Sequence, residues 1–347
     1  MIKRTLFISN PFHVSTKLNQ LVLKNKKTGE EKQTPIEDVG FIVFEHEECT
    51  FSLQAIHHLN ENNVASVFCN EKHLPTSMLL NLDSNDIQSQ LFSHQIGASE
   101  PIKKQLWQQT IKAKIINQAS LLQQLGKPNE TLLRCAANVK SGDTTNEEAK
   151  ASRYYWANFF VDSSTPAQNS ASARLKKQDS PSMSSSVTNS PVTLSEEQSD
   201  ESKSEACNEA MKVKFTRNRF GLPPNNLFNY GYAILRAGVA RALAGSGLLP
   251  TLGIHHHNKY NAFCLADDIM EPYRPFVDRL VVQIVNDTPE YSELTTELKT
   301  RLLSVLTTDI CINDATSPLM VGLSQTTASL AECFTGERKT IKYPEMI

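Results

Sequence analysis

The sequence predicts an α+β protein in which an N-terminal β-sandwich precedes a mainly α-helical domain that carries a disordered insertion. Short apolar or alternating runs separated by polar turns fill residues 1–84. Apolar residues recur with the helical period of 3.6 in residues 85–161 and 211–347. Serine and acidic residues dominate 162–210, which follows neither pattern. We therefore expect one helical domain in two parts, 85–161 and 211–347.

Strand patterns dominate the N-terminal domain. Strands are expected at 5–9, 21–23, 40–45, 48–52 and 64–69. The polar turn 25–32 predicts a hairpin, and the spacing of apolar residues in 53–62 predicts a helix. Because strands outnumber helices here, a small β-sandwich or split sheet with one helix fits this domain best.

The helical domain begins with a long helix expected at 102–125. Further helices are expected at 130–139, 145–160, 225–244, 266–283, 292–306 and 326–334. Asn146 or the preceding Asp143 is suited to cap the helix 145–160, because either side chain can accept a hydrogen bond from a first-turn N–H. Tyr155 and Trp156 of this helix are expected in the core.

The insertion at 162–210 differs in composition from the rest of the chain. Its segments 163–166, 182–186 and 195–202 are rich in serine, and the tract is acidic and nearly free of aromatic residues. Such a composition cannot bury enough apolar surface to offset the entropy lost on ordering. We expect these residues to be disordered.

Composition limits the compartment. The 347 residues contain no apolar run near the ~20 residues that span a bilayer, and the first residues lack the pattern of a signal peptide. The seven cysteines form no C-x-x-C pair, which favours reduced thiols over a disulfide framework or a zinc site. We expect a cytoplasmic protein.

Total charge is uninformative about partners. The net charge of −2 argues mildly against a nucleic-acid-binding protein. Outside residues 161–210, however, the chain carries 31 basic and 29 acidic residues. Only local clusters of basic residues can therefore indicate a nucleic-acid partner. Four bases near aromatic residues suit a nucleic-acid backbone, with a solvated loop as the alternative: Lys212, Lys214, Arg217 and Arg219.

Residues 253–278 contain the most informative motif. Three adjacent histidines, 255–257, are followed by Asp267, Asp268 and Glu271. Asp268 and Glu271 are three residues apart and share a helical face. Imidazole with carboxylates suits a divalent-metal site for phosphate chemistry. A solvated helix face and a surface histidine loop are the alternatives. Successive extended residues alternate in direction, so three neighbouring histidines cannot all serve one metal.

A second acidic pair, Glu147 and Glu148, opens the helix expected at 145–160. Adjacent helical residues point roughly 100° apart, so only one of the two can face a site. Both residues could instead simply favour the positive end of the helix dipole.

Taken in order, these blocks resemble the CRISPR-associated adaptation integrases, the metal-dependent nucleases that insert new spacers, in their type II variant. The resemblance runs through nearly the whole chain outside 161–210. Its motifs lie at 35–40, 63–73, 106–109, 114–119, 141–149, 229–236, 253–256 and 270–275. It implies an N-terminal β-sandwich and a C-terminal helical catalytic domain. A tract as long as the insertion departs from the short connection that the family usually has there.

The resemblance also implies a site. It assigns Glu148, His256 and Glu271 as catalytic residues and as ligands of Mg²⁺ or Mn²⁺, with Asp268 in support. It selects Glu148 over Glu147 and the middle histidine over its neighbours. The implied reaction is attack by the 3′-hydroxyl of spacer DNA on a phosphodiester of the CRISPR repeat.

The implied partners are double-stranded DNA, as spacer precursor and repeat, and a second copy of the chain. Two such homodimers would flank a dimer of a small adaptation partner protein in a heterohexamer, and the type II variant implies an RNA-guided effector. Two other functions remain open at this point. One is a structure-selective DNA repair nuclease without integration, and the other a catalytically silent DNA-binding scaffold.

Overall fold

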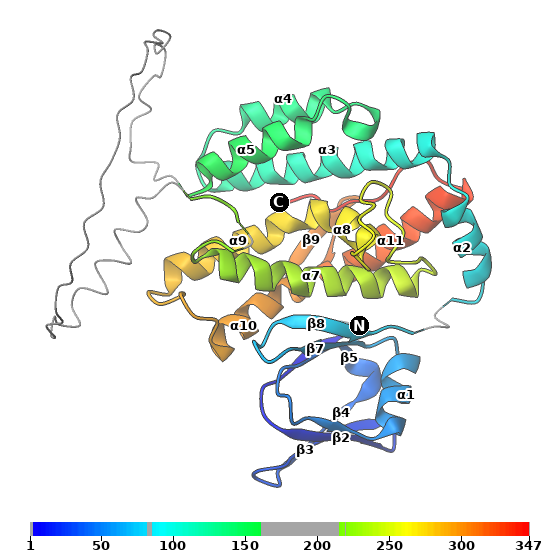
Figure 1. The fold of residues 1–347 in the computed structure, drawn as a ribbon, viewed down its shortest axis with the longest axis vertical. Coiled ribbons are helices and arrows are strands. Elements are labelled where there is room, and N and C mark those ends of the chain that lie inside the picture. Colours follow the sequence, from blue (N-terminus) through cyan, green and yellow to red (C-terminus); the bar gives the residue numbers. More distant parts are fainter. Residues whose placement is uncertain (1–2, 82–84, 161–214, 219, 347) are drawn as a thin grey trace, which may run out of the picture.

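The computed structural model describes residues 3–81, 85–160, 215–218 and 220–346. In Figure 1 the described chain is layered: two β-sheets lie at one end, and two layers of helices follow. The insertion predicted to be disordered lies outside the described residues, as do three of the predicted DNA-binding residues, Lys212, Lys214 and Arg219.

Two four-stranded sheets form the N-terminal part and confirm the predicted sandwich. The first has the order β1 (Arg4–Ile8), β5 (Val39–Phe44), β7 (Ala65–Cys69), β8 (Pro75–Leu79), and only β8 pairs antiparallel. The second has the order β4 (Glu31–Pro35), β3 (Gln20–Asn25), β2 (Phe12–Lys17), β6 (Thr50–Phe51). The predicted hairpin is the β3–β4 pair.

The single predicted helix of this part is α1 (Leu53–Glu61), whose N-cap Ser52 accepts a hydrogen bond from the Ala55 amide. Apolar residues of both sheets and of this helix share one core. The sequence pattern missed β2 and β8, because β2 buries only Val14 and β8 buries no residue fully. Such half-exposed strands lack a clear apolar alternation.

Helices build most of the remainder of the described chain. Their bounds are α2 (Gln88–Ile96), α3 (Glu100–Gln124), α4 (Glu130–Asn138), α5 (Glu147–Phe159), α7 (Asn225–Gly245), α8 (Cys264–Met270), α9 (Arg274–Asp287), α10 (Thr296–Leu303) and α11 (Leu319–Thr335). In Figure 1, α3, α4 and α5 form the outer layer, and α7, α8, α9 and α11 lie between them and the sheets. None of the helices in this described part combines the length and apolar character that crossing a membrane requires.

The helix expected at 266–283 is in fact two helices. The first, α8, ends at Met270, the 3₁₀ turn η3 (Glu271–Tyr273) follows, and α9 begins at Arg274. Pro272 and Pro275 occupy first-turn positions, where a missing N–H costs nothing, and inside one continuous helix each would remove a hydrogen bond. The expectation of one helix was therefore wrong, and Glu271 stands at the break.

Two further elements were not expected. The helix α2 precedes α3, and a hairpin of β9 (Asp309–Ile312) and β10 (Ala315–Pro318) interrupts the helical part. Asn313 and Asp314 form its two-residue turn with φ of 50° and 60°. Two positive φ values are the mark of the hairpin turn that favours Asn and Asp. The helix expected at 326–334 also begins earlier, at Leu319.

Asn117, buried on α3, joins the two helical layers. Its Nδ2 donates to the carbonyl oxygens of Pro272, at 2.8 Å, and Pro344, at 2.9 Å. Its Oδ1 accepts from the Met346 amide at 3.1 Å. The C-terminus accordingly lies between the layers in Figure 1. Because Pro272 follows Glu271 directly, this amide also fixes Glu271 relative to α3.

Candidate metal centre

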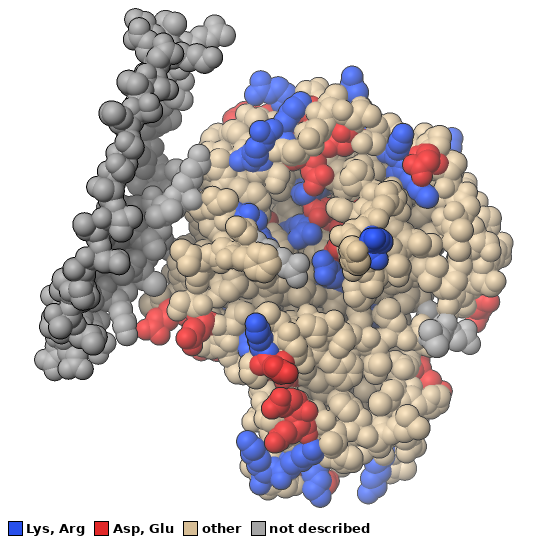
Figure 2. Space-filling view, viewed as in Figure 1, with Lys and Arg blue, Asp and Glu red and all other residues tan. Residues whose placement is uncertain are grey.

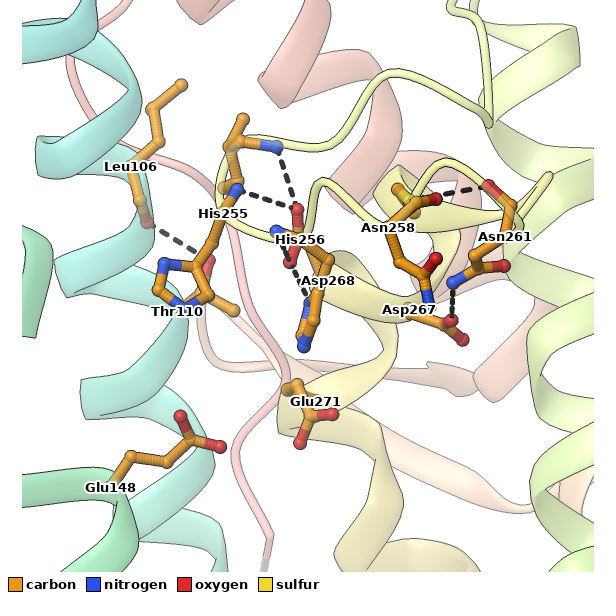
Figure 3. Close-up of polar contacts among 12 residues, drawn as sticks. Leu106, Thr110, Glu148, His255, His256, Asn258, Asn261, Asp267, Asp268 and Glu271 are labelled. Atoms are coloured by element: carbon orange, nitrogen blue, oxygen red, sulfur yellow. Dashed lines mark hydrogen bonds and ion pairs between the residues drawn. The ribbon is translucent and has the colours of Figure 1, made fainter. Parts of the chain in front are cut away.

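Three elements present the predicted ligands to one space between the helical layers (Figure 3). Glu148 is the second residue of α5, Glu271 is the first residue of η3, and His256 lies in the loop between α7 and α8. The fold thus brings together residues that lie far apart in the sequence. Their role as metal ligands stays a prediction.

Lys114 of α3 lies between the two carboxylates. Its Nζ is 2.7 Å from Oε1 of Glu148 and 2.6 Å from Oε2 of Glu271. Oε1 of Glu271 accepts a hydrogen bond from Arg274 Nε at 2.8 Å, so each oxygen of this carboxylate faces a cation. An ammonium group therefore occupies the position between the carboxylates. Within the described residues, no three His, Cys, Asp or Glu side chains are yet arranged around one metal-sized point.

The charges of this cluster support one another. Burial raises the pKa of Glu271, but Arg274 and Lys114 outweigh it and lower this pKa to about 2. Burial likewise lowers the pKa of Lys114, while Glu271 and Glu148 outweigh it and raise this pKa above its ordinary value. Both groups are therefore charged at neutral pH.

Asp268, which is fully buried on α8, organises the histidine loop. Its Oδ2 accepts from the amides of Ile254, at 2.7 Å, and His255, at 3.0 Å. Its Oδ1 accepts from the His256 amide, at 3.2 Å, and lies 2.5 Å from Nδ1 of the same ring. A Cβ at Gly253 would lie 2.8 Å from Asp268 Oδ2, so glycine permits this close approach.

The contact with Asp268 decides which nitrogen of His256 is available. A carboxylate only accepts hydrogen bonds, so Nδ1 carries the proton and Nε2 is left for a ligand. A histidine that binds a metal through one ring nitrogen usually donates a hydrogen bond to a carboxylate through the other. The hydrogen bond to Asp268 raises the pKa of His256, although burial opposes it. Two carboxylates and an imidazole with a free Nε2 therefore have the donor chemistry that suits a divalent cation.

The neighbouring histidines differ from His256 in their surroundings. The ring of His255 stacks on Trp107, with centroids 4.1 Å apart and an interplanar angle of 2°. His257 is exposed. In Figure 3 the ring of His256 points toward Glu271.

Asp143 sets the direction of the two glutamates. Its carboxylate accepts from the amide of Glu147 at 2.8 Å and from that of Glu148 at 3.0 Å. Of the two expected caps, Asp143 therefore supplies the hydrogen bonds, whereas Asn146 at the N-cap position makes none with its side chain. Glu147 turns to Lys150, at 2.7 Å, and Glu148 turns to Lys114.

A cavity of about 260 Å³ adjoins Glu271. Its lining includes the basic residues Lys114, Arg217 and Arg274. Arg217, the described member of the predicted DNA-binding set, donates to Asn225 at 2.9 Å and Asn229 at 2.7 Å, and no carboxylate pairs with it in the described chain. In Figure 2 acidic and basic side chains meet in a hollow on this face.

Sequence reasoning missed Lys114 as a member of the site. The available signal was its position, since it continues the apolar register of Trp107 and Ile111 along α3. A lysine on the buried face of a helix needs a partner of opposite charge. Its partners, on α5 and η3, could not be identified from spacing.

Two proteins of known sequence are similar to this chain. The CRISPR-associated endonuclease Cas1 of Neisseria meningitidis serogroup C (strain 8013) is 29% identical over 350 residues, spanning 100% of this chain and 97% of that protein. The CRISPR-associated endonuclease Cas1 1 of Francisella tularensis subsp. novicida is 36% identical over 81 residues, 23% of this chain and 26% of that protein.

Solved structures share the fold. A casposase bound to an integration product gives a TM-score of 0.71 at 16% identity, covering 100% of this chain and 95% of that chain. A Cas1 protein from Thermotoga maritima gives 0.64 at 15% identity, with 96% and 97% covered. At these identities the likeness shows the fold alone, and it agrees with the fold class expected from the sequence.

A family model described as CRISPR associated protein Cas1 matches residues 6–168 and 214–298. The match spans more than half of the chain, and its gap falls within or beside the insertion identified from composition. The two matched segments include all three residues of the candidate metal centre. This chain therefore belongs to the CRISPR-associated Cas1 protein family.

Proposed function

We propose that this protein is a divalent-metal-dependent DNA endonuclease and integrase that inserts spacer DNA into a CRISPR array. The observation that carries the proposal is the convergence of Glu148, Glu271 and His256, the last oriented by buried Asp268. The relatives named as Cas1 endonucleases, and the shared fold of a casposase bound to an integration product, support the same reaction class.

The carboxylates of Glu148 and Glu271 and the Nε2 of His256 would hold one Mg²⁺ or Mn²⁺. Two oxygen ligands and one imidazole suit either ion. Such an ion, when bound, polarises a phosphodiester and stabilises the charge that develops on it.

The chain's own residues supply alignment and charge. Asp268 holds the ring of His256 in one tautomer and orientation, and Arg274 holds the carboxylate of Glu271. Arg217 and Lys114 border the cavity beside Glu271, where a backbone phosphate of DNA would bind. In the proposed reaction, a spacer 3′-hydroxyl loses its proton and its oxygen bonds to a repeat phosphorus, while the bond from that phosphorus to the 3′-oxygen of the repeat strand breaks and the released 3′-oxygen takes up a proton. Holding these groups in line is the main catalytic contribution.

We also propose that homodimers of the chain act with a small adaptation partner, as two homodimers around one partner dimer on double-stranded DNA. The fold shared with a Cas6-RT-Cas1–Cas2 complex, with a TM-score of 0.66 at 17% identity over 100% of this chain and 37% of that chain, supports a partner protein but carries no stoichiometry.

Strand transfer tests the proposed function. A labelled duplex with free 3′-hydroxyls is incubated with repeat-containing plasmid, the partner protein and Mg²⁺ or Mn²⁺. The wild type should join the duplex to the repeat, while Glu148→Gln, His256→Ala and Glu271→Gln should lose more than about 100-fold. Glu147→Gln is the matched control and should retain activity, because Glu147 pairs with Lys150 instead.

The other outcomes identify the alternatives. Cleavage of DNA without joining would identify a repair-type nuclease, and binding without either reaction would identify a scaffold. Full strand transfer by both Glu148→Ala and His256→Ala would show that the assigned site is wrong.

A further inference from the structure

The buried ammonium of Lys114 lies between the two carboxylates that are proposed to hold the divalent cation. The exposed fraction of its side chain is 10%, and those of its partners Glu148 and Glu271 are 30% and 7%. Arg274 pairs with the other oxygen of Glu271. Two carboxylates and two cations therefore form a cluster of zero formal charge.

This balance opposes binding of a divalent cation by itself. An incoming cation must compete with the ammonium of Lys114 for the same two carboxylate oxygens. It also leaves the cluster with two surplus positive charges, in a site largely shielded from water. A buried surplus of charge is costly unless an anion compensates it.

The adjoining cavity offers a place for that anion. Three cations and two acidic residues line the cavity of about 260 Å³: Lys114, Arg217 and Arg274, with Glu271 and Asp278. A phosphate group of DNA carries one negative charge, which offsets one of the two surplus positive charges, and it pairs readily with ammonium and guanidinium groups. The Lys114 ammonium could thus exchange its carboxylate partners for phosphate oxygens without leaving the site.

We propose that Lys114 couples divalent-cation binding to DNA binding, serving as an internal counter-ion that passes from the carboxylates to a DNA phosphate when the cation binds. The proposal rests on the proposed function only for the identity of the cation site. Strand transfer need not occur. Coupling between two ligands is reciprocal, so the cation must strengthen DNA binding by the same factor.

Binding of Mn²⁺ to the full chain, followed by the electron paramagnetic resonance of free Mn²⁺, tests the coupling. The DNA is a short duplex with 3′-dideoxy ends, which cannot react, and Mn²⁺ bound by this duplex alone is subtracted. In the wild type the duplex should strengthen Mn²⁺ binding by on the order of 10- to 100-fold.

Lys114→Met should behave differently. Without the competing ammonium, this variant should bind Mn²⁺ more tightly than the wild type in the absence of DNA, and the duplex should add less than about 3-fold. Lys112→Met, on the same helix but exposed, is the matched control and should behave as the wild type does. If the Met variant does not fold, Lys114→Gln replaces it, because its amide donates hydrogen bonds without charge.

Two results would overturn the coupling. One is equal Mn²⁺ affinity of the wild type with and without the duplex, and the other is unchanged coupling in a folded Lys114 variant. A separate variant isolates the proposed function. If Glu271→Gln binds Mn²⁺ as tightly as the wild type in both conditions, the cation site itself is misassigned. Loss of Mn²⁺ binding in Glu271→Gln with unchanged coupling in the Lys114 variant refutes the coupling alone.

Discussion

Asp278 is a buried carboxyl group held by two tyrosines at the edge of the site. Its Oδ2 accepts from Tyr155 at 2.8 Å and its Oδ1 accepts from Tyr232 at 2.5 Å. Burial raises the pKa of Asp278 to about 7, although both hydroxyls and Arg274 act to lower it. The folded protein therefore keeps this proton at a pH where the unfolded chain, with its ordinary pKa of 3.8, has lost it.

This difference predicts a pH effect on stability. The stability from the protonated group is fully present below about pH 4 and is lost as pH rises to about 7. Between pH 5 and pH 8, this group should cost the wild type about 1–3 kcal/mol of unfolding free energy. Asp278→Asn should remove that loss. Urea unfolding of both proteins at the two pH values measures it, and parallel pH dependences would contradict the buried-carboxyl account.

Some residues of the candidate site could be predicted from the sequence, and others could not. The histidine–carboxylate block and the acidic pair were visible as patterns, and resemblance selected Glu148, His256 and Glu271 among them. Spacing could not reveal that Asp268 holds Nδ1 of His256 and so turns this nitrogen away from Glu148 and Glu271. That arrangement depends on three backbone amides of the histidine loop, which donate to Asp268. It also could not reveal the partners of Lys114, because tertiary packing alone sets them.

Among the elements, α5 depends on its cap for the direction of Glu148. Asp143→Ala would leave the amides of Glu147 and Glu148 without an acceptor. We expect a loss of about 1 kcal/mol in unfolding free energy and weaker strand transfer, because the first turn then frays. Asp143→Asn keeps a hydrogen-bond acceptor and should retain most of the unfolding free energy and of the strand-transfer activity. Chemical denaturation and the strand-transfer assay measure the two effects, and an alanine variant with full activity would show that the cap does not position Glu148.

The elements with long apolar periodicity were the predictable ones. Both α3 and α7 bury apolar residues at helical spacing along their length, and their bounds were expected to within two residues. The break between α8 and α9 was missed because the apolar pattern continues through Pro272 and Pro275, whereas the backbone cannot. This break places Glu271 at the start of a short turn beside Arg274 and Lys114.

At the scale of the whole molecule, a buried ion pair joins the N-terminal sheets to the helices. Lys299 of α10 bonds to Oε1 of Glu45, directly after β5, and their side chains are 7% and 6% exposed. His73 Nδ1 lies 3.6 Å from the same oxygen. Both side chains are almost fully buried, so removing one would leave the other as a buried charge without its ion-pair partner.

Lys299→Met should therefore destabilise the protein by about 3–5 kcal/mol, because the carboxylate of Glu45 stays buried without its partner. The double variant Lys299→Met with Glu45→Gln should recover much of that loss. Lys24→Met, which breaks an exposed pair with Glu31 at 3.3 Å, is the control and should change stability by less than about 1 kcal/mol. Denaturant unfolding gives all three values. A Lys299 variant as stable as this control would show that the Lys299–Glu45 ion pair does not stabilise the contact between the sheets and the helices.

The distribution of charge, rather than its total, carries the functional signal of the molecule. The net charge of −2 gave no indication of a DNA partner. The fold gathers Lys114, Arg217 and Arg274 around one cavity beside the candidate metal centre, from helices on both layers and the segment before α7. Composition cannot show such a grouping, because it arises only when distant segments meet.

The central claim is that Glu148, His256 and Glu271 hold one divalent cation. Anomalous scattering from Mn²⁺ in crystals of the protein with a 3′-dideoxy duplex tests it most directly. We expect one peak in contact with all three side chains, and its loss in crystals of Glu271→Gln. A peak bound elsewhere, or one that persists unchanged in Glu271→Gln, would contradict the account.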